Sequence, residues 1–210
     1  MTGSPGSTTA QEGHQDGPPG AGSAGSAGSP VTDPGTRLDD GRPVVLRPLG
    51  PDDEAALAAF GAGLDADDWR YLDLDLRDAA VVARLVQAHE AAIWRQVVAV
   101  APGPDGERVL GYSTVRRLAG WQSHVADVHL VVAAEARRRG VGGALARATL
   151  EAARDLGVTK VTLGVLAEQG PGLEIFERHG FAVEGRLRGQ VRDEAGREHD
   201  IVLLGLVLGA

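Results

Sequence analysis

The chain of 210 residues contains no cysteine. This absence excludes disulfide bonds, a cysteine nucleophile, thiolate zinc sites and iron–sulfur clusters. Lysine is nearly absent as well, since Lys160 is the single lysine among 21 basic residues. A protein without disulfides is compatible with a reducing compartment, and we expect a cytoplasmic location.

The sequence also lacks an excess of basic charge and a long hydrophobic run. Its 29 acidic residues outnumber the 21 basic ones and give a net charge of -8. General nucleic-acid binders gain most of their affinity from basic side chains on phosphates, so we expect no nucleic-acid partner. The longest strongly apolar run, Ile201–Ala210, is about half the length that spans a bilayer. We interpret it as a buried strand and expect no membrane partner.

Composition divides the chain into two parts. Residues 1–43 hold 10 of the 30 glycines and 6 of the 11 prolines, and residues 21–29 repeat alanine, glycine and serine. Such a segment cannot bury enough apolar surface to offset about 1–2 kcal/mol of backbone entropy for each ordered residue. We therefore predict a disordered N-terminal tail over residues 1–43 and one folded domain over residues 44–210.

Hydrophobic periodicity predicts both helices and strands in the folded part. Two helices are expected to begin at Pro51 and Asp78, because proline suits a first helical turn and aspartate caps it. Two more are expected at residues 141–156 and 173–179. The stretch Asp65–Arg77 is ambiguous between strand, helix and loop. Strands are expected at residues 44–47, 94–101, 109–118, 125–132, 161–166, 181–189 and 199–208.

The segment Val131–Gly143 joins the end of an apolar strand, a run of arginine and glycine, and a helix start. The first N–H groups of a helix lack internal partners and lie at the positive end of its dipole, so they bind anions. Neither the Rossmann nor the P-loop glycine pattern is present. A solvated arginine run at an ordinary turn is the alternative interpretation. The residues expected at an anion site here are Arg137, Arg138, Arg139, Gly140, Val141, Gly142 and Gly143.

The arginine–glycine loop and a later block of the sequence together resemble a known family. The pattern Arg137-x-x-Gly140-x-Gly142, after a strand and at the head of a helix, resembles the acetyl-CoA pyrophosphate loop of the GNAT family of N-acetyltransferases. Gln169 and then the block Ile175–Phe181 resemble the family's Asn and Leu-Tyr-x-x-x-Gly-Phe signature at the expected distance. The resemblance spans about residues 44 to 208. Further matching segments are Leu-Arg-Pro at 46–48, Asp-Asp at 52–53, Glu-Gly at 184–185 and Gly-x-x-His-Asp at 196–200.

The resemblance implies a fold and an activity. The fold is α/β (α+β), with a mixed, mostly antiparallel sheet of about six to seven strands, helices on both faces and a splayed parallel strand pair. The activity is direct transfer of an acetyl group from acetyl-CoA, as cosubstrate, to a small-molecule or protein amine, with no metal. The cofactor's pantetheine arm is expected between strands 126–132 and 161–166, against the backbone of Val131 and Val132. Gln169 and Phe176 occupy positions that contact the cofactor.

The chemistry requires a group that takes a proton from the amine. Asp127, His129 and Val131 project to one face of their strand, because side chains alternate with period two. A histidine has an ordinary pKa of about 6.5, which suits a base near neutral pH. We therefore predict His129 or Asp127 as the catalytic base, and backbone N–H groups near Val131 as donors to the oxyanion. The alternatives are a packed histidine and a solvated carboxylate.

The sequence departs from the family at two positions. Gln169 replaces the asparagine, and Phe176 replaces the tyrosine usually assigned as general acid. The second departure supports an alternative function, a catalytically weak acyl-CoA-binding regulatory domain, and a nucleotide-binding module is a further rival.

The segment Asp65–Asp78 is expected to border the acceptor site, where its aspartates suggest a cationic acceptor. A homodimer is left open.

Overall fold

The structure is a computed structural model of the chain. It describes Arg37, Gly41, Asp68 and residues 43–65, 74–104, 106–193 and 195–209. The predicted tail lies outside the described residues except for Arg37, Gly41 and Pro43. Among these, Arg37 and Pro43 form an isolated antiparallel bridge.

The described residues form a seven-stranded sheet and four α-helices. The predicted strands and helices are all present, with ends that shift by a few residues. In chain order the elements are β1 (Val45–Pro48), α1 (Glu54–Ala62), α2 (Ala79–Gln87), β2 (Trp94–Gly103), β3 (Gly106–Arg117), β4 (Val125–Val132), α3 (Val141–Asp155), β5 (Lys160–Leu166), α4 (Gly170–Arg178), β6 (Ala182–Arg192) and β7 (Glu198–Val207).

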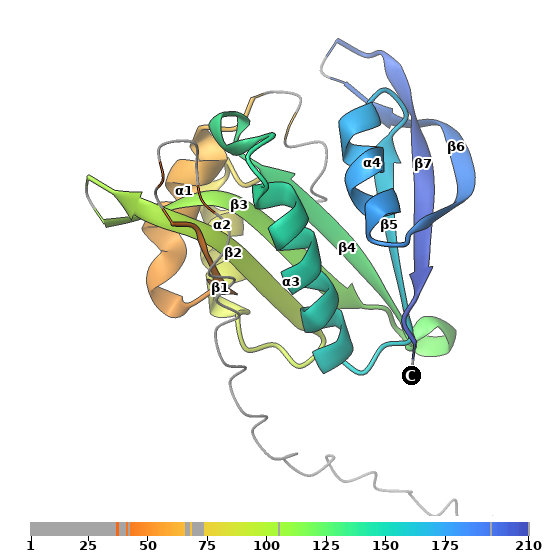
Figure 1. Cartoon of the computed structure of the whole chain (residues 1–210), viewed down its shortest axis with the longest axis horizontal. Helices are drawn as coiled ribbons and strands as arrows, with labels where there is room; N and C mark the ends of the chain where they lie inside the picture. The colour runs from red at the N-terminus through yellow and green to blue at the C-terminus, as the bar shows by residue number, and fades with distance from the viewer. Residues whose placement is uncertain are drawn as a thin grey trace, which may run out of the picture.

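The sheet has the strand order β1-β2-β3-β4-β5-β7-β6, and neighbouring strands are antiparallel except for the pair β4 and β5. These two parallel strands are paired over three residues each, from Val125 opposite Lys160 to Asp127 opposite Thr162. Beyond that point they diverge (Figure 1). The structure therefore confirms the mixed, mostly antiparallel sheet and its splayed parallel pair.

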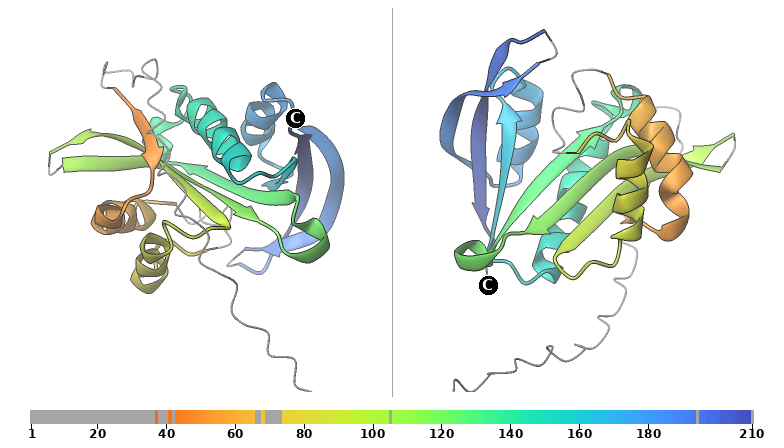
Figure 2. Two further views of the ribbon diagram at one scale, coloured as in Figure 1. Left: turned by 90° about the horizontal axis from the view of Figure 1, so that it is seen from below. Right: turned by 180° about the vertical axis from the view of Figure 1, so that it is seen from behind.

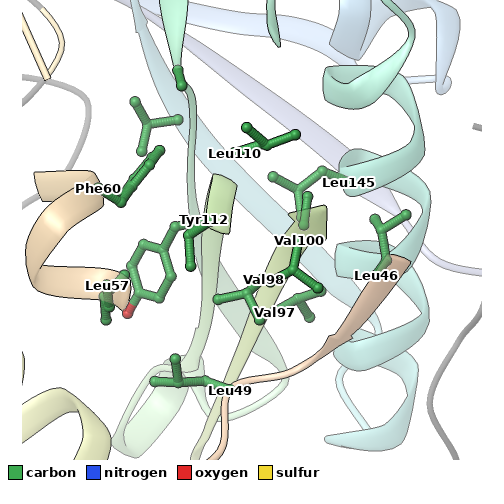
Figure 3. Close-up of a cluster of buried hydrophobic side chains, with 14 of the residues drawn as sticks. Leu46, Leu49, Leu57, Phe60, Val97, Val98, Val100, Leu110, Tyr112 and Leu145 are labelled. Atoms are coloured by element: carbon green, nitrogen blue, oxygen red, sulfur yellow. The ribbon is translucent and has the colours of Figure 1, made fainter. Parts of the chain in front are cut away.

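Helices cover the sheet on both faces. Helices α3 and α4 lie on one face, and α1 and α2 lie on the other, over the β1–β3 side (Figure 2). Leu57 and Phe60 of α1 pack against Tyr112, whereas Leu145 of α3 packs against the same strands from the opposite face (Figure 3). A second apolar cluster joins β5, β7 and α4 and includes the fully buried Leu204.

Local sequence explains how the α1–α2 side is built. The carboxylate of Asp78 caps α2 by accepting a hydrogen bond of 2.8 Å from Ala80 N. Gly61 of α1 lies against the backbone carbonyl of Leu76, so closely that a Cβ atom at position 61 would collide with it. The ambiguous stretch before α2 thus places Leu76 in the core rather than in a strand. None of the helices in the described ranges is long and apolar enough to cross a membrane.

Candidate active site

The head of α3 presents backbone N–H groups to its surroundings. Gly140 is the N-cap residue and has no side chain with which to cap the helix. Ala144 N donates to Gly140 O at 3.1 Å, which closes the first turn. The N–H groups of Val141, Gly142 and Gly143 precede that bond and point out of the helix. They and the helix dipole favour an anion at this position.

The loop before α3 has an unusual backbone. Arg138 has a φ of 59° and is the one residue other than glycine with positive φ among those described. Gly140 follows with a φ of 82°. Left-handed conformation costs a residue with a side chain roughly 1–2 kcal/mol. Loops that mix left-handed and ordinary conformations can point successive N–H groups into one concave anion site, and such strain concentrates at functional sites.

Arg137 is held by two neighbours. Its Nε donates to the carbonyl oxygen of Val132 at 3.0 Å, so the side chain folds back over the loop. Its Nη2 lies 2.5 Å from Oδ2 of Asp68, a buried residue between α1 and α2. No sequence pattern pointed to Asp68, because the two residues lie far apart in the chain. Arg137, predicted as a phosphate ligand, therefore also joins the cofactor loop to the α1–α2 side.

Divergence of β4 from β5 leaves backbone groups of β4 without a ladder partner on that edge. Ala133 N donates to Leu110 O, and hydrogen-bonding direction alternates along an antiparallel pair. Val131 therefore turns its N–H and C=O toward β3, whereas Leu130 and Val132 turn theirs toward the gap. Of the two residues predicted to offer backbone hydrogen bonds to a ligand in the gap, Val132 turns its backbone groups toward the gap, as Leu130 does, and Val131 turns its groups toward β3.

Gly142 lies where three elements meet. A Cβ atom built on it would be 3.2 Å from Cδ1 of Ile175 in α4 and 3.8 Å from Cγ2 of Val132 in β4. Glycine therefore lets α3 pack closely against α4 and β4, and a larger side chain would displace these neighbours. The outward N–H groups and the Arg137–Arg139 run suit a polyanion such as the diphosphate of a coenzyme A thioester.

Asp127 and His129 form a pair on β4. His129 Nε2 lies 2.9 Å from Oδ2 of Asp127, and both side chains are only partly exposed. Residues 128, 130 and 132 face α3, so this pair lies on the opposite face of the sheet. A carboxylate only accepts hydrogen bonds, so the hydrogen of this contact lies on Nε2. The pair lies next to the point where β4 and β5 separate.

Phe176 and Gln169 lie on the α4 side of the gap. Phe176 is 8% exposed and packs edge-to-face on Phe181, with ring centroids 5.4 Å apart. Gln169 is the N-cap residue of α4, but its side chain makes no capping hydrogen bond. The ring of Phe176 supplies packing and has no proton to donate. A group that protonates a leaving thiolate must therefore come from elsewhere.

Tyr112 is an obvious substitute acid in the sequence, but the structure rules it out of the gap. Its hydroxyl is buried and donates to Oε1 of Gln96 at 2.5 Å, and Gln96 in turn donates to Leu85 O. Burial raises the pKa of Tyr112 above its ordinary value. The ring lies among α1 side chains (Figure 3), where it stabilises the core.

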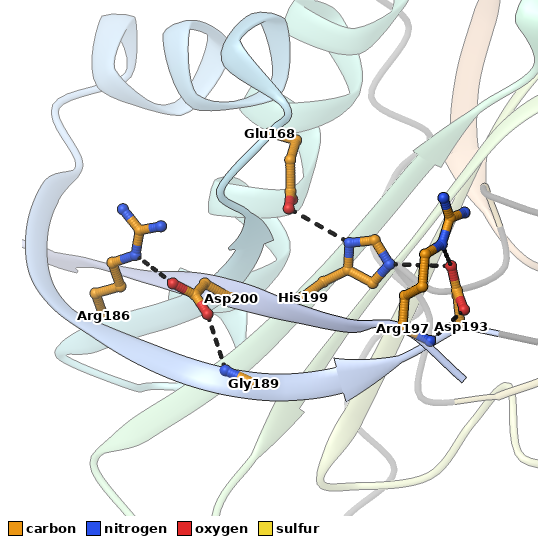
Figure 4. A network of polar contacts seen from close by, with 7 residues as sticks. All are labelled: Glu168, Arg186, Gly189, Asp193, Arg197, His199 and Asp200. Carbon is orange, nitrogen blue, oxygen red and sulfur yellow. Dashed lines mark hydrogen bonds and ion pairs between the residues drawn. The ribbon is translucent and has the colours of Figure 1, made fainter. Parts of the chain in front are cut away.

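A polar network at the start of β7 was not anticipated from the sequence (Figure 4). His199 Nε2 lies 3.2 Å from Oδ2 of Asp193, and its Nδ1 lies 3.3 Å from Oε1 of Glu168. Burial alone would raise the pKa of Asp193, but hydrogen bonds from Arg197 and His199 outweigh it and hold this pKa below its ordinary range. The network ties the β6–β7 turn to the segment that precedes α4.

Asp200, the neighbour of His199, belongs to a different set of contacts. Its carboxylate accepts from Arg186 Nε at 2.7 Å and from Gly189 N at 2.8 Å. The adjacent histidine and aspartate therefore do not form a dyad, as the alternation of side chains along a strand predicts.

A groove of about 1240 Å³ lies elsewhere on the molecule, between α1 and the β2–β3 hairpin. It is lined by small residues of α1 and by charged residues such as Arg47, Glu107 and Glu135. None of the predicted site residues lines it. Among the described residues, no three or more histidine, aspartate or glutamate side chains are grouped to hold a metal ion.

Comparison with known proteins identifies the class of this fold and site. The sequence profile of the acetyltransferase (GNAT) family matches residues 64–181, which is more than half of the chain. The chain belongs to this family. The match includes the Asp127–His129 pair, the Arg137–Gly143 loop and the Gly-Phe block.

Individual relatives agree with this assignment. The chain is similar to the L-amino acid N-acetyltransferase AaaT of Escherichia coli (strain K12), with 30% identity over 102 residues, 44% of this chain and 62% of that protein. The chain spans 48% and 62% of the lengths of the curated relatives it matches.

Solved structures share the fold. A GNAT-family acetyltransferase from Streptococcus pneumoniae superposes with a TM-score of 0.66 at 19% identity, covering 79% of this chain and 99% of that one. YncA from Salmonella typhimurium, solved with its cofactor acetyl-CoA, gives a TM-score of 0.65 at 17% identity, covering 79% and 94%.

Proposed function

We propose that this protein transfers an acetyl group from acetyl-CoA to an amine, directly and without a covalent intermediate on the chain. The observation that carries the proposal is the glycine-capped head of α3, with its outward N–H groups and arginines, at the mouth of the gap between β4 and β5. The absence of cysteine supports direct transfer.

When bound, acetyl-CoA supplies a thioester whose carbonyl carbon forms a C–N bond with the amine as its C–S bond breaks. The residues Val141–Gly143 and the arginine run hold the diphosphate. Backbone groups of Leu130 and Val132 line the gap and can orient the acyl arm. The Asp127–His129 pair takes the proton that the amine must lose, a role that typically contributes about 10²–10⁴ in rate.

We further propose that the acceptor approaches the face of the sheet that carries the Asp127–His129 pair. No helix of the described residues lies over β5 and β7 on that face (Figure 2). The name of the relative AaaT makes L-amino acids the first acceptors to test. Diamines and short basic peptides are the next, because the sequence between α1 and α2 is rich in aspartate.

The test measures release of coenzyme A thiol from acetyl-CoA in the presence of an amine panel. Thiol release that depends on the amine, together with a product of acetyl mass, is the expected result. Binding of coenzyme A without turnover on any amine would contradict the proposal. That result would instead favour the second candidate, an acyl-CoA-binding regulatory domain, for which the buried Phe176 at the usual acid position is the supporting observation.

A further inference from the structure

Asp68 is a buried carboxylate that lies beside the guanidinium of Arg137. The residue is 4% exposed, and its Oδ2 makes no hydrogen bond with correct geometry among the described residues. The same oxygen lies 2.5 Å from Nη2 of Arg137. A buried carboxylate is costly unless an opposite charge lies beside it, and the guanidinium of Arg137 supplies such a charge.

Arg137 can hold Asp68 and still face a ligand. Its Nε serves Val132 O and one Nη2 hydrogen serves Asp68, while the planar guanidinium carries further N–H donors on Nη1. The side chain is 42% exposed, so part of the guanidinium is open to solvent at the loop that leads into α3.

Asp68 could either compete with a diphosphate for Arg137 or position Arg137 for it. Competition would require Arg137 to leave Asp68. Asp68 is 4% exposed, so little water is available to replace the guanidinium at its carboxylate. The ion pair should therefore persist when the ligand binds.

We propose that Asp68 is a positioning residue for acetyl-CoA: from the α1–α2 side it fixes the Arg137 guanidinium so that its remaining donors meet the diphosphate. This inference rests on the proposed function and deepens it. It makes Asp68, which lies between α1 and α2 in the chain, a support of the loop that leads into α3.

A double-mutant cycle on the full chain tests the proposal, with coenzyme A binding measured by calorimetry. Asp68→Asn should raise the Kd by about tenfold, and Arg137→Gln should raise it by at least as much. The double variant should bind within about twofold of Arg137→Gln, because Asp68 acts through Arg137. Asp75→Asn is the matched control, since Asp75 pairs with the exposed Arg77 and should leave the Kd unchanged.

Kinetics and a conservative variant separate positioning from a merely structural role. For Asp68→Asn we expect the KM for acetyl-CoA to rise while kcat stays within about twofold, and Asp68→Glu should restore most of the affinity. Arg137→Lys provides a second route if Asp68→Asn does not fold. A lysine lacks the planar fork that serves two acceptors at once, so it should bind coenzyme A as weakly as Arg137→Gln.

An unchanged or tighter Kd for folded Asp68→Asn would overturn the proposal, and so would additive effects in the double variant or wild-type affinity in Arg137→Lys. Failure of the wild-type chain to bind coenzyme A would overturn the proposed function and this inference together. Wild-type binding and turnover with an unaffected Asp68→Asn would overturn this inference alone.

Discussion

The half of the sheet from β1 to β4 and the half made of β5, β7 and β6 are covered differently. In the first half, α3 covers one face and α1 and α2 cover β1–β3 on the other, and the middle of β2 and β3 is almost entirely buried. The second half has α4 on one face, and β6 exposes Val183 at 58% and Leu187 at 37%. The two halves meet at the short β4–β5 ladder.

The difference assigns separate tasks to the two halves. Under the proposed function, the first half carries the groups that must be placed most accurately, namely the Asp127–His129 pair and the loop that opens α3. The second half lies beside these groups, and no helix of the described residues covers β5 and β7 on the face opposite α4. A two-substrate reaction needs both properties, because one substrate must be fixed while the other enters.

The sharpest test of this division is Gly142→Glu. Gly142 lies in α3, which covers the first half, and it faces Ile175 of α4, which covers the second. The new carboxylate would occupy the space beside Val132 and Ile175 and repel a diphosphate, so coenzyme A binding should be abolished in calorimetry. The fold should survive, because position 142 is partly exposed. Gly142→Ala is the control and should lose far less affinity. Wild-type affinity in Gly142→Glu would remove the diphosphate from this loop.

The next largest effect concerns the base on β4. His129→Ala and Asp127→Ala should each lower kcat, by up to about 10²–10⁴ for the residue that takes the proton, and should flatten the acid limb of the pH–rate profile. His89→Ala is a matched histidine control, because its Nδ1 contacts Val86 O at a helix end away from β4. If both β4 variants keep wild-type rates and profiles, the proton goes to water or to another group.

Stability should also distinguish buried from open parts of the sheet. Leu57→Ala in the first half and Leu204→Ala in the second remove fully buried side chains, and each should cost about 2–5 kcal/mol of unfolding free energy. Leu187→Ala on the exposed β6 should cost less than about 1 kcal/mol. Urea unfolding measures all three. An equal cost at position 187 would show that a partner or another segment covers β6.

The smallest expected effect is that of Phe176→Tyr. If water already protonates the leaving thiolate, restoring a hydroxyl at this position should change kcat by less than about tenfold, or 1.4 kcal/mol of barrier. A thermal melt of the variant checks that the added hydroxyl is tolerated beside Phe181. A gain of a hundredfold or more would show that the wild-type chain lacks an acid, and would favour the regulatory interpretation.

Local patterns were enough to predict most of the fold. Apolar periodicity located the strands and helices, and the Arg137–Gly142 spacing with the Gly-Phe block identified the family and its splayed strand pair. Asp127 and His129 were placed on one face by simple alternation. These features depend on neighbours within a few residues, and sequence records such neighbours directly.

Features that depend on register or on distant contacts could not be predicted. Whether Val131 or Val132 faces the gap depends on how β3 pairs with β4, and a shift of one residue reverses the answer. The Asp68–Arg137 pair and the Glu168–His199–Asp193 network join segments that only tertiary packing brings together. Aspartates in the α1–α2 connection suggested a cationic acceptor, whereas Asp68 already has a cation within the chain.

The left-handed backbone of Arg138 has a consequence for how this loop can vary. Glycine is the residue that adopts this conformation without strain, and a mutation to glycine would relieve it in a single step. A chain under selection for stability alone would be expected to take that step. If the side chain of Arg138 serves binding, libraries that vary residues 137–139 should recover glycine at position 138 when selected for folding and arginine when selected for coenzyme A binding.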